Sequence, residues 1–355
     1  MGIALFFLAV GLMTSSTLVS GFYILMLVPA ILLYFDRKNK IFLSKSSLML
    51  LLLFAWGIIS GLAHLGEMEN VRKSFDELKF YLFGFAFIMP LRYYGEHTTK
   101  HQHKKIINLF LFTLIVCFIA AGLDSWFGIK LRDMTLNSPS GRSGGFVHIM
   151  RYGYSNALVF VLLLATYFNR KKLQEFITPK LFYPALVCSL LAVFAAQTRG
   201  AILGLFASIP FLLYRYKPKM AKIVLGLGVA AFIGMVGVSL SLGDKSPIRL
   251  INLKDNSSSI RVSQYLTGLI AMKENLLLGL GPTQLSYHVA DIKDRHDLWA
   301  KDYTGQHSHN TFIEHGASFG VPGFILFILF LAFWFKEMIG LRSDFGWAIA
   351  SYIVG

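Results

Sequence analysis

The feature that most constrains this chain is the repetition of apolar stretches close to the length of a membrane span. Crossing the hydrocarbon core of a bilayer as a helix takes roughly 20 apolar residues. Stretches of this kind lie near residues 3–19, 22–35, 47–63, 80–91, 106–123, 152–168, 181–196, 200–214, 223–242 and 321–335, and a further one begins near residue 345. Hydrophobic residues make up 55% of the chain and charged residues 15%. We therefore expect an all-α polytopic membrane protein of about 10–12 transmembrane helices, and we exclude a soluble globular enzyme.

The distribution of positive charge predicts the orientation of these spans. If the N-terminus lies in the cytoplasm, the inner loops are 36–46, 92–105, 169–180, 215–222 and 336–344, and together they hold 18 Lys and Arg against 5 Asp and Glu. An excess of basic residues on the cytoplasmic side is the usual rule for membrane proteins. These short loops carry +13 of the formal net charge of +15, which predicts anchoring at the membrane surface and no binding of nucleic acid.

This orientation divides the chain into three parts. Residues 1–242 are expected to form transmembrane helices 1–9, residues 243–319 one long periplasmic loop, and residues 320–355 the C-terminal transmembrane helices, the last of them apparently incomplete. The long loop is not a plain linker, because apolar residues recur at helical spacing from Ile260 to Leu278. We expect an amphipathic helix there, with Ser259 as its N-cap and Gly279 after its end.

Two arginines are candidates for binding an anion. Arg199 lies in a very short outer turn between two apolar stretches, where an arginine is costly unless it reaches water or a polar cavity. Arg261 lies near the start of the predicted outer helix, whose free N–H groups attract phosphate. The alternatives are an interfacial anchor for Arg199 and a solvated loop residue for Arg261.

A histidine cluster precedes the span that begins near residue 321. His307, His309 and His315, with Glu314, offer metal-ligand chemistry, but the helical His-Glu-x-x-His arrangement of zinc proteases is missing and both cysteines lie inside apolar stretches. An imidazole that removes the proton of an alcohol acceptor is favoured over a metal site. Interfacial polar residues are the alternative for His307 and His315.

Taken together, these residues resemble the O-antigen ligase family. His309-Asn310, nine further residues, Gly320, two residues and Gly323 match one family pattern, and Arg199 with Leu203 matches an Arg-x-x-x-Leu pattern. The order of elements also agrees: many spans, an arginine at an outer turn, then a long outer loop that holds Arg261 and the His-Asn segment. The chain departs from the family at its C-terminus, where further spans are usual.

The resemblance implies transfer of O-antigen or a similar glycan from undecaprenyl diphosphate to lipid A-core, at the periplasmic face of the bacterial inner membrane, in lipopolysaccharide biosynthesis. It implies His309, Arg261 and Arg199 as catalytic residues. Asn310, Glu314 and His307 are implied as substrate-binding residues. The expected reaction is an inverting transfer without a metal or other cofactor, in which the partners are the lipid-linked donor, the lipid A-core acceptor and membrane lipids.

Other activities remain open from the sequence. An O-antigen polymerase or a protein O-oligosaccharyltransferase of the same superfamily would share the donor site and differ in the acceptor. A lipid or glycan transporter would place ionisable residues at mid-membrane in several spans. The apolar stretches here are nearly free of charge, which disfavours transport.

Overall fold

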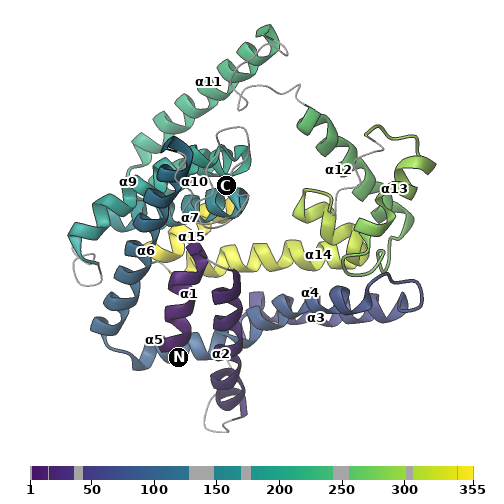
Figure 1. Cartoon of the computed structure of the whole chain (residues 1–355), viewed down its shortest axis with the longest axis horizontal. Coiled ribbons are helices and arrows are strands. Elements are labelled where there is room, and N and C mark those ends of the chain that lie inside the picture. Colours follow the sequence, from purple (N-terminus) through teal and green to yellow (C-terminus); the bar gives the residue numbers. More distant parts are fainter. Residues whose placement is uncertain are drawn as a thin grey trace. The chain divides into compact units, whose positions relative to one another are not determined.

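The computed structural model describes residues 2–14, 16–35, 43–127, 148–168, 177–242, 256–300, 307–341 and 343–354. Within these ranges the chain forms helices and no strand (Figure 1). The helices are α1 Gly2–Thr14, α2 Ser16–Phe35, α3 Lys45–Ala63, α4 Val71–Ala86, α5 Ile88–His97, α6 Lys100–Phe127, α7 Ile149–Phe168, α9 Pro179–Ala196, α10 Arg199–Tyr216, α11 Pro218–Leu242, α12 Asn256–Glu274, α13 Leu285–Arg295, α14 Thr311–Gly340 and α15 Asp344–Val354.

Five of the described helices are long and apolar enough to cross a membrane, by length and composition. They are Leu18–Phe35, Lys45–Ala63, Lys100–Leu123, Pro179–Ala196 and Thr311–Gly340. The protein is therefore an all-α polytopic membrane protein, as the sequence predicted. The expected total of 10–12 spans, and the division at residues 242 and 319, stay predictions.

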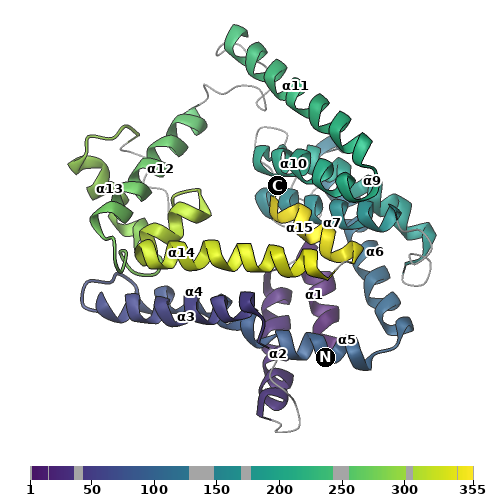
Figure 2. The same cartoon turned by 180° about the vertical axis from the view of Figure 1, so that it is seen from behind.

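The chain forms two compact units. Unit 1 consists of residues 1–40, 89–233 and 335–355, and unit 2 of residues 41–88 and 234–334. In unit 1, α7 packs against α9, α10 and α15, and α6 packs against α1 and α9 (Figure 2). The largest core cluster of this unit gathers apolar side chains from α6, α7 and α9: Leu111, Leu114, Cys117, Val159, Leu163, Phe182 and Ala185.

Two predicted stretches differ from the helices that form. The boundary between the first two was expected near residue 20, but α1 ends at Thr14 and α2 begins at Ser16. Gly11 is the cause of a tight hairpin here, since a Cβ on it would lie 2.8 Å from the Leu18 Cβ. The stretch 80–91 is not one helix, because Phe87 separates α4 from α5.

Unit 2 is built around a break in α14. Gly320 has φ 69° and ψ −170°, so the helix is interrupted at the point where the outer loop was expected to end. The gap is filled by the segment after α12: the N–H groups of Leu280 and Gly281 donate to the carbonyls of Ala317 and Ser318, at 2.8 and 3.0 Å, and Val321 N–H donates to the Leu276 carbonyl at 2.8 Å. The freed backbone groups of α14 are thereby satisfied inside the protein.

Two glycines make this contact possible. A Cβ on Gly279, which has φ 68°, would lie 2.4 Å from the carbonyl carbon of Ser318, and a Cβ on Gly320 would lie 2.5 Å from the Leu277 oxygen. Helix α3 braces the same place, because Trp56 Nε1 donates to the Phe319 carbonyl at 2.9 Å and Ser60 Oγ to the Leu278 carbonyl at 2.7 Å. Gly320 is thus required by backbone conformation and close approach together.

The outer helix α12 forms, but two details of the prediction are wrong. It begins at Asn256, so Ser259 is an internal residue and not the N-cap, and Arg261 lies in the second turn. Its buried face is also different: Ser263, Thr267 and Ala271 are buried, whereas apolar residues of the predicted stripe are exposed, among them Val262, Leu269 and Leu276. Close packing against the segment before α14 selects small residues for the buried side.

Candidate active site

The first candidate residue, Arg199, directly follows the two-residue turn between α9 and α10. Gln197 ends α9 in the left-handed conformation, with φ 48°, and Thr198 is the N-cap of α10. Arg199 is then the first residue of α10 and is half-buried. Gly200 accommodates the Tyr154 hydroxyl of α7, which a side chain at this position would displace.

The second candidate region is the short segment 307–310 in front of α14. His309 has φ 56°, a conformation that residues with a Cβ rarely adopt. The segment is held by its own polar groups: the Glu314 carboxylate accepts from Ser308 N–H at 2.7 Å, and Ser308 Oγ donates to the Asn310 carbonyl at 2.9 Å. The strained backbone of His309 is therefore fixed on both sides.

Asn310 also caps α14. Its Oδ1 accepts from the backbone N–H groups of Phe312 and Ile313, at 3.0 and 3.1 Å, which satisfies two of the donors that a helix N-terminus leaves open. Because Asn310 Oδ1 and a Glu314 carboxylate oxygen are bound to backbone, these side chains hold His309 in place.

His307 lies beside His309, and Arg261 is near enough to act on His309 electrostatically. The rings of His307 and His309 lie 4.4 Å apart in an edge-to-face arrangement, and His309 is exposed. Partial burial lowers the pKa of His309, and the positive charges of His307 and Arg261 lower it further. All three effects favour the neutral imidazole, which is the form that accepts a proton.

The approach of α12 to this segment explains how Arg261 comes near. At Gly268, a Cβ would lie 2.5 Å from Ile313 Cγ2 and 3.1 Å from the Ser308 Cβ, so the two segments touch there. Arg261 precedes Gly268 by seven residues, which is two helical turns and the same face of the helix. Arg261 is half-buried on that face.

A cavity of about 460 Å³ lies beside this segment, within unit 2. Polar groups line it from α4, the 282–284 turn, the start of α13, His307 and the start of α14, and apolar groups close it from α4 and α14. The lining residues are Lys73, Glu77, Leu78, Phe80, Tyr81, Pro282, Thr283, Ser286, His307, Glu314, His315, Ser318, Phe319 and Phe327. A cavity with a few polar groups among aromatic ones is typical of a small-molecule binding site.

Sequence reasoning missed the contribution of α4 to this cavity. Lys73, Glu77 and Tyr81 are spaced four residues apart and therefore share one face of that helix. The spacing is visible in the sequence, but Tyr81 was assigned to an apolar span. Nothing in the sequence indicated that α4 would meet a segment more than two hundred residues away.

His315 differs from the other two histidines because it is buried and fully bonded. Its Nε2 pairs with the Tyr81 hydroxyl at 2.8 Å, its Nδ1 pairs with the Thr311 carbonyl at 2.7 Å, and its ring stacks on Phe327 with centroids 3.9 Å apart. These contacts assign His315 to the support of the site. In the described part of the chain, no group of three or more His, Cys, Asp or Glu side chains is arranged to hold a metal ion.

Comparison with known proteins agrees with the resemblance noted in the sequence. Residues 184–328 match a family model described as O-antigen ligase. The matched segment contains Arg199, Arg261 and His309, and it includes the break at Gly320. No curated protein matches the chain. The segment 184–328 of this chain is therefore similar to the O-antigen ligase family.

Proposed function

We propose that the protein is an O-antigen ligase. It transfers O-antigen, or a similar glycan, from undecaprenyl diphosphate to lipid A-core at the periplasmic face of the inner membrane. The observation that carries the proposal is the placement of His309 beside His307, within the electrostatic range of Arg261, inside the matched segment and next to a cavity lined by polar and aromatic groups. An anion-binding side chain next to a neutral base is the pair of groups that such a transfer needs.

His309 acts as the general base. The acceptor hydroxyl attacks the anomeric carbon of the glycan, its proton passes to the neutral imidazole of His309, and the bond between that carbon and the diphosphate oxygen breaks. The electron pair of the broken bond leaves with undecaprenyl diphosphate. Attack on the side opposite the leaving group inverts the anomeric configuration.

Arginine side chains bind the leaving group. Charge builds on the diphosphate as the bond breaks, and a guanidinium offers paired donors that fit phosphate oxygens. Arg261 supplies this charge next to His309. The second arginine role is the one that the resemblance implies for Arg199, which is the first residue of α10 in unit 1, and we propose it on the resemblance alone. With these two cations the reaction proceeds without a metal ion.

His307, Asn310 and Glu314 serve the base and the sugars. His307 lines the cavity and is assigned to the acceptor glycan. The resemblance implies Asn310 and Glu314 as substrate-binding residues, but their bonds to the backbone around His309 favour a role in orienting the base. They are positioning residues in this account.

The orientation of the chain is part of the proposal. Single cysteines at Lys217, Asn256 and His309, in a chain whose Cys117 and Cys188 are replaced, are probed on spheroplasts with a membrane-impermeant thiol reagent. We expect labelling at 256 and 309 and none at 217. Labelling at 217 alone would invert the topology and remove the functional assignment with it.

The activity is tested by deleting the gene in a strain that makes a long glycan. A ligase is expected to leave full-length glycan on its lipid carrier and the lipid A-core bare. Lipid A-core that carries a single repeat unit would identify a polymerase instead, since that product needs ligation without chain extension. Unchanged lipopolysaccharide would overturn both.

A further inference from the structure

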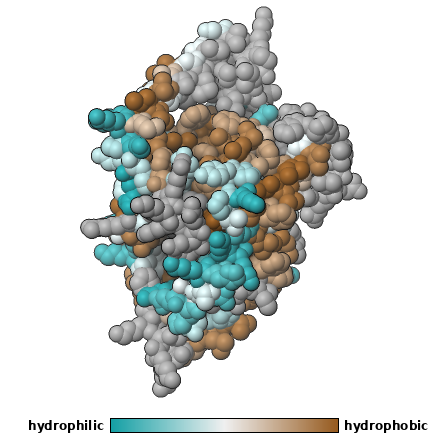
Figure 3. Space-filling view, turned by 90° about the vertical axis from the view of Figure 1, so that its left-hand side faces the viewer, coloured by the Kyte–Doolittle hydropathy of each residue, from teal (hydrophilic) through white to brown (hydrophobic). Residues whose placement is uncertain are grey.

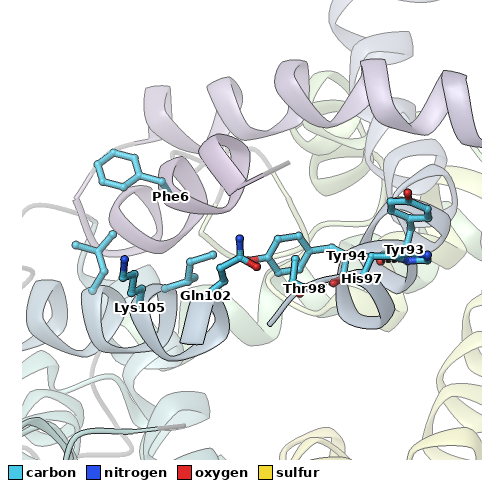
Figure 4. Close-up of a pocket in the computed structure, with 9 residues that line it drawn as sticks. Phe6, Tyr93, Tyr94, His97, Thr98, Gln102 and Lys105 are labelled. Atoms are coloured by element: carbon cyan, nitrogen blue, oxygen red, sulfur yellow. Dashed lines mark hydrogen bonds between the residues drawn. The ribbon is translucent and has the colours of Figure 1, made fainter. Parts of the chain in front are cut away.

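A second cavity, of about 630 Å³, lies in unit 1, where α5, α6 and α1 meet (Figure 4). It contains none of the residues assigned to glycan transfer. Its walls come from Phe6 of α1, from the end of α5, and from the first turns of α6. Figure 4 shows Gln102 and Lys105 rising from α6 on the side of Phe6.

The cavity has one polar and one apolar part. Tyr94, Gln102 and Lys105 supply a hydroxyl, an amide and an ammonium group, whereas Phe6 and Leu109 supply apolar surface. Along α6 the polar part changes to the apolar part from one residue to the next, because Lys105 is followed by the apolar stretch that starts at Ile106. A ligand that fills this space has an anionic or polar head and an apolar tail.

The polar part is pre-organised by local hydrogen bonds. Gln102 Oε1 accepts from the N–H of Thr99 at 3.0 Å, and Thr99 Oγ1 accepts from the N–H of Gln102 at 3.3 Å. This reciprocal pair caps α6 and fixes the amide of Gln102 with its nitrogen as the remaining donor. Tyr93 and His97 stack at 3.9 Å and stiffen the α5 wall.

The surroundings are strongly basic. Residues 92–105 contain four Lys and Arg and one acidic residue, Glu96, which is bonded to Arg92 at 2.8 Å. Figure 3 shows the face of the molecule on this side, where hydrophilic residues in the lower part border hydrophobic residues above them. Since α6 is one of the helices long and apolar enough to cross a membrane, we expect Lys105, at the start of its apolar stretch, to lie at headgroup depth.

We propose that this cavity binds an anionic glycerophospholipid of the surrounding leaflet, with its phosphate at Lys105 and Gln102 and an acyl chain along Phe6, Ile106 and Leu109. Basic pockets between membrane helices are a recognised way to bind anionic head groups. The apolar lining selects a lipid over a soluble phosphate. In the orientation predicted from charge, the leaflet is the cytoplasmic one.

The test is native mass spectrometry of the full-length protein in mild detergent. The protein is equilibrated with equal amounts of phosphatidylglycerol and phosphatidylethanolamine that carry the same acyl chains. We expect retention of phosphatidylglycerol in preference. Lys105→Gln is expected to weaken that retention about fivefold, the effect of one basic residue at a membrane surface. Ile106→Trp, which fills the apolar part, is expected to weaken retention of the same lipid.

The matched control is Lys104→Gln, which removes the same charge from the neighbouring position without changing the cavity lining. It should retain phosphatidylglycerol as the wild type does. Equal loss in the Lys104 and Lys105 variants would reduce the effect to general charge attraction and overturn the site. Equal retention of the two lipids by the wild type, or displacement of the bound lipid by inorganic phosphate, would overturn it as well. Each variant is compared only after it elutes as a monodisperse species.

Discussion

Two connections in this protein each place a residue with a positive φ shortly before a helix, but the N-termini of the two helices are capped differently. Gln197, before α10, and His309, before α14, both have a positive φ, 48° and 56°. At α14 the side chains of Asn310 and Glu314 bond to the backbone around the helix start. At α10 the N-cap hydroxyl of Thr198 donates back to the Ala196 carbonyl at 3.4 Å, and Arg199 follows as the first helical residue.

We relate this difference in capping to different roles of the two connections. Left-handed backbone at a residue with a Cβ costs on the order of 1–3 kcal/mol and persists only where the surroundings enforce it. Before α14 the strained residue is His309 itself, so the bonds from Ser308, Asn310 and Glu314 fix the direction of the proposed base. Before α10 the strain falls on Gln197, and the turn presents an arginine at the positive end of a helix. In the proposed mechanism the first region supplies the base His309, and the second region supplies Arg199, which binds the diphosphate in addition to Arg261.

The largest expected effect comes from breaking the support under the 307–310 segment. Gly320→Ala places a Cβ 2.5 Å from the Leu277 oxygen at a positive φ, so the paired backbone of residues 276–281 and 317–321 cannot form. We expect loss of most monodisperse protein after detergent extraction. Gly66→Ala is the control, because a Cβ there meets nothing within 4 Å. Wild-type yield and activity for Gly320→Ala would show that the break in α14 is dispensable.

The next largest effect is expected from removing either arginine. Arg261→Ala and Arg199→Ala are each expected to lower the transfer rate on the order of 10²-fold to 10³-fold, as loss of one group that stabilises transition-state charge does. Lysine at either position restores only part of the rate, because the paired donors are lost. The rates are measured with purified protein and lipid-linked donor. A wild-type rate in either alanine variant would remove that arginine from the mechanism.

The cap of α14 is expected to matter less and in a different way. Asn310→Ala removes the acceptor for Phe312 and Ile313 N–H and lowers the free energy of unfolding by about 1 kcal/mol. Asn310→Asp keeps an acceptor and serves as the control. The midpoint of thermal unfolding in detergent reports the change. If the aspartate variant is destabilised as much as the alanine variant, the side chain acts by something other than capping.

The smallest expected effect is a shift in pH dependence. The rate should fall as pH falls through the pKa of His309, because protonation removes the base. That pKa lies below its ordinary value through burial and the positive charges of His307 and Arg261. His307→Gln removes one of these causes, so the pKa of His309 rises and the acid limb moves to higher pH. A limb that stays in place, or moves to lower pH, contradicts the assignment of His309 as the titrating base.

How far the sequence predicted this molecule depends on the range of the interactions involved. The turn at Gln197 and Thr198 follows from two apolar stretches and the polar residues between them, and it forms as expected. The existence of α12 followed from apolar spacing, but its buried face did not, because a tight contact with Ser308 and Ile313 selects Gly268 and other small residues. The spacing of apolar residues indicates which face of a helix is hydrophobic, but it carries no information about the distant segments that pack against that helix.

The same limit applies to the candidate site. His309 was named from the family pattern and Arg261 from its place near the start of the predicted outer helix, and their roles stay predictions. The contribution of Tyr81 and the bonded state of His315 depend on a pairing across more than two hundred residues. The sequence also did not predict that α14 begins at Thr311. The polar residues from His309 to His315 favoured a loop, and the glycine at 320 favoured a boundary between that loop and a membrane span.

The most direct test of the account compares His309→Ala with His315→Ala in the transfer of glycan from a polyprenyl-diphosphate donor to lipid A-core by purified protein in excess EDTA. The wild type is expected to stay active. His309→Ala should lose activity on the order of 10²-fold to 10⁴-fold, the range for removal of a general base. His315→Ala, which loses the bonds to Tyr81 and Thr311, should lower thermal stability far more than the rate per folded molecule. A wild-type rate for His309→Ala, or activity that EDTA abolishes and a divalent ion restores, would contradict the proposed mechanism.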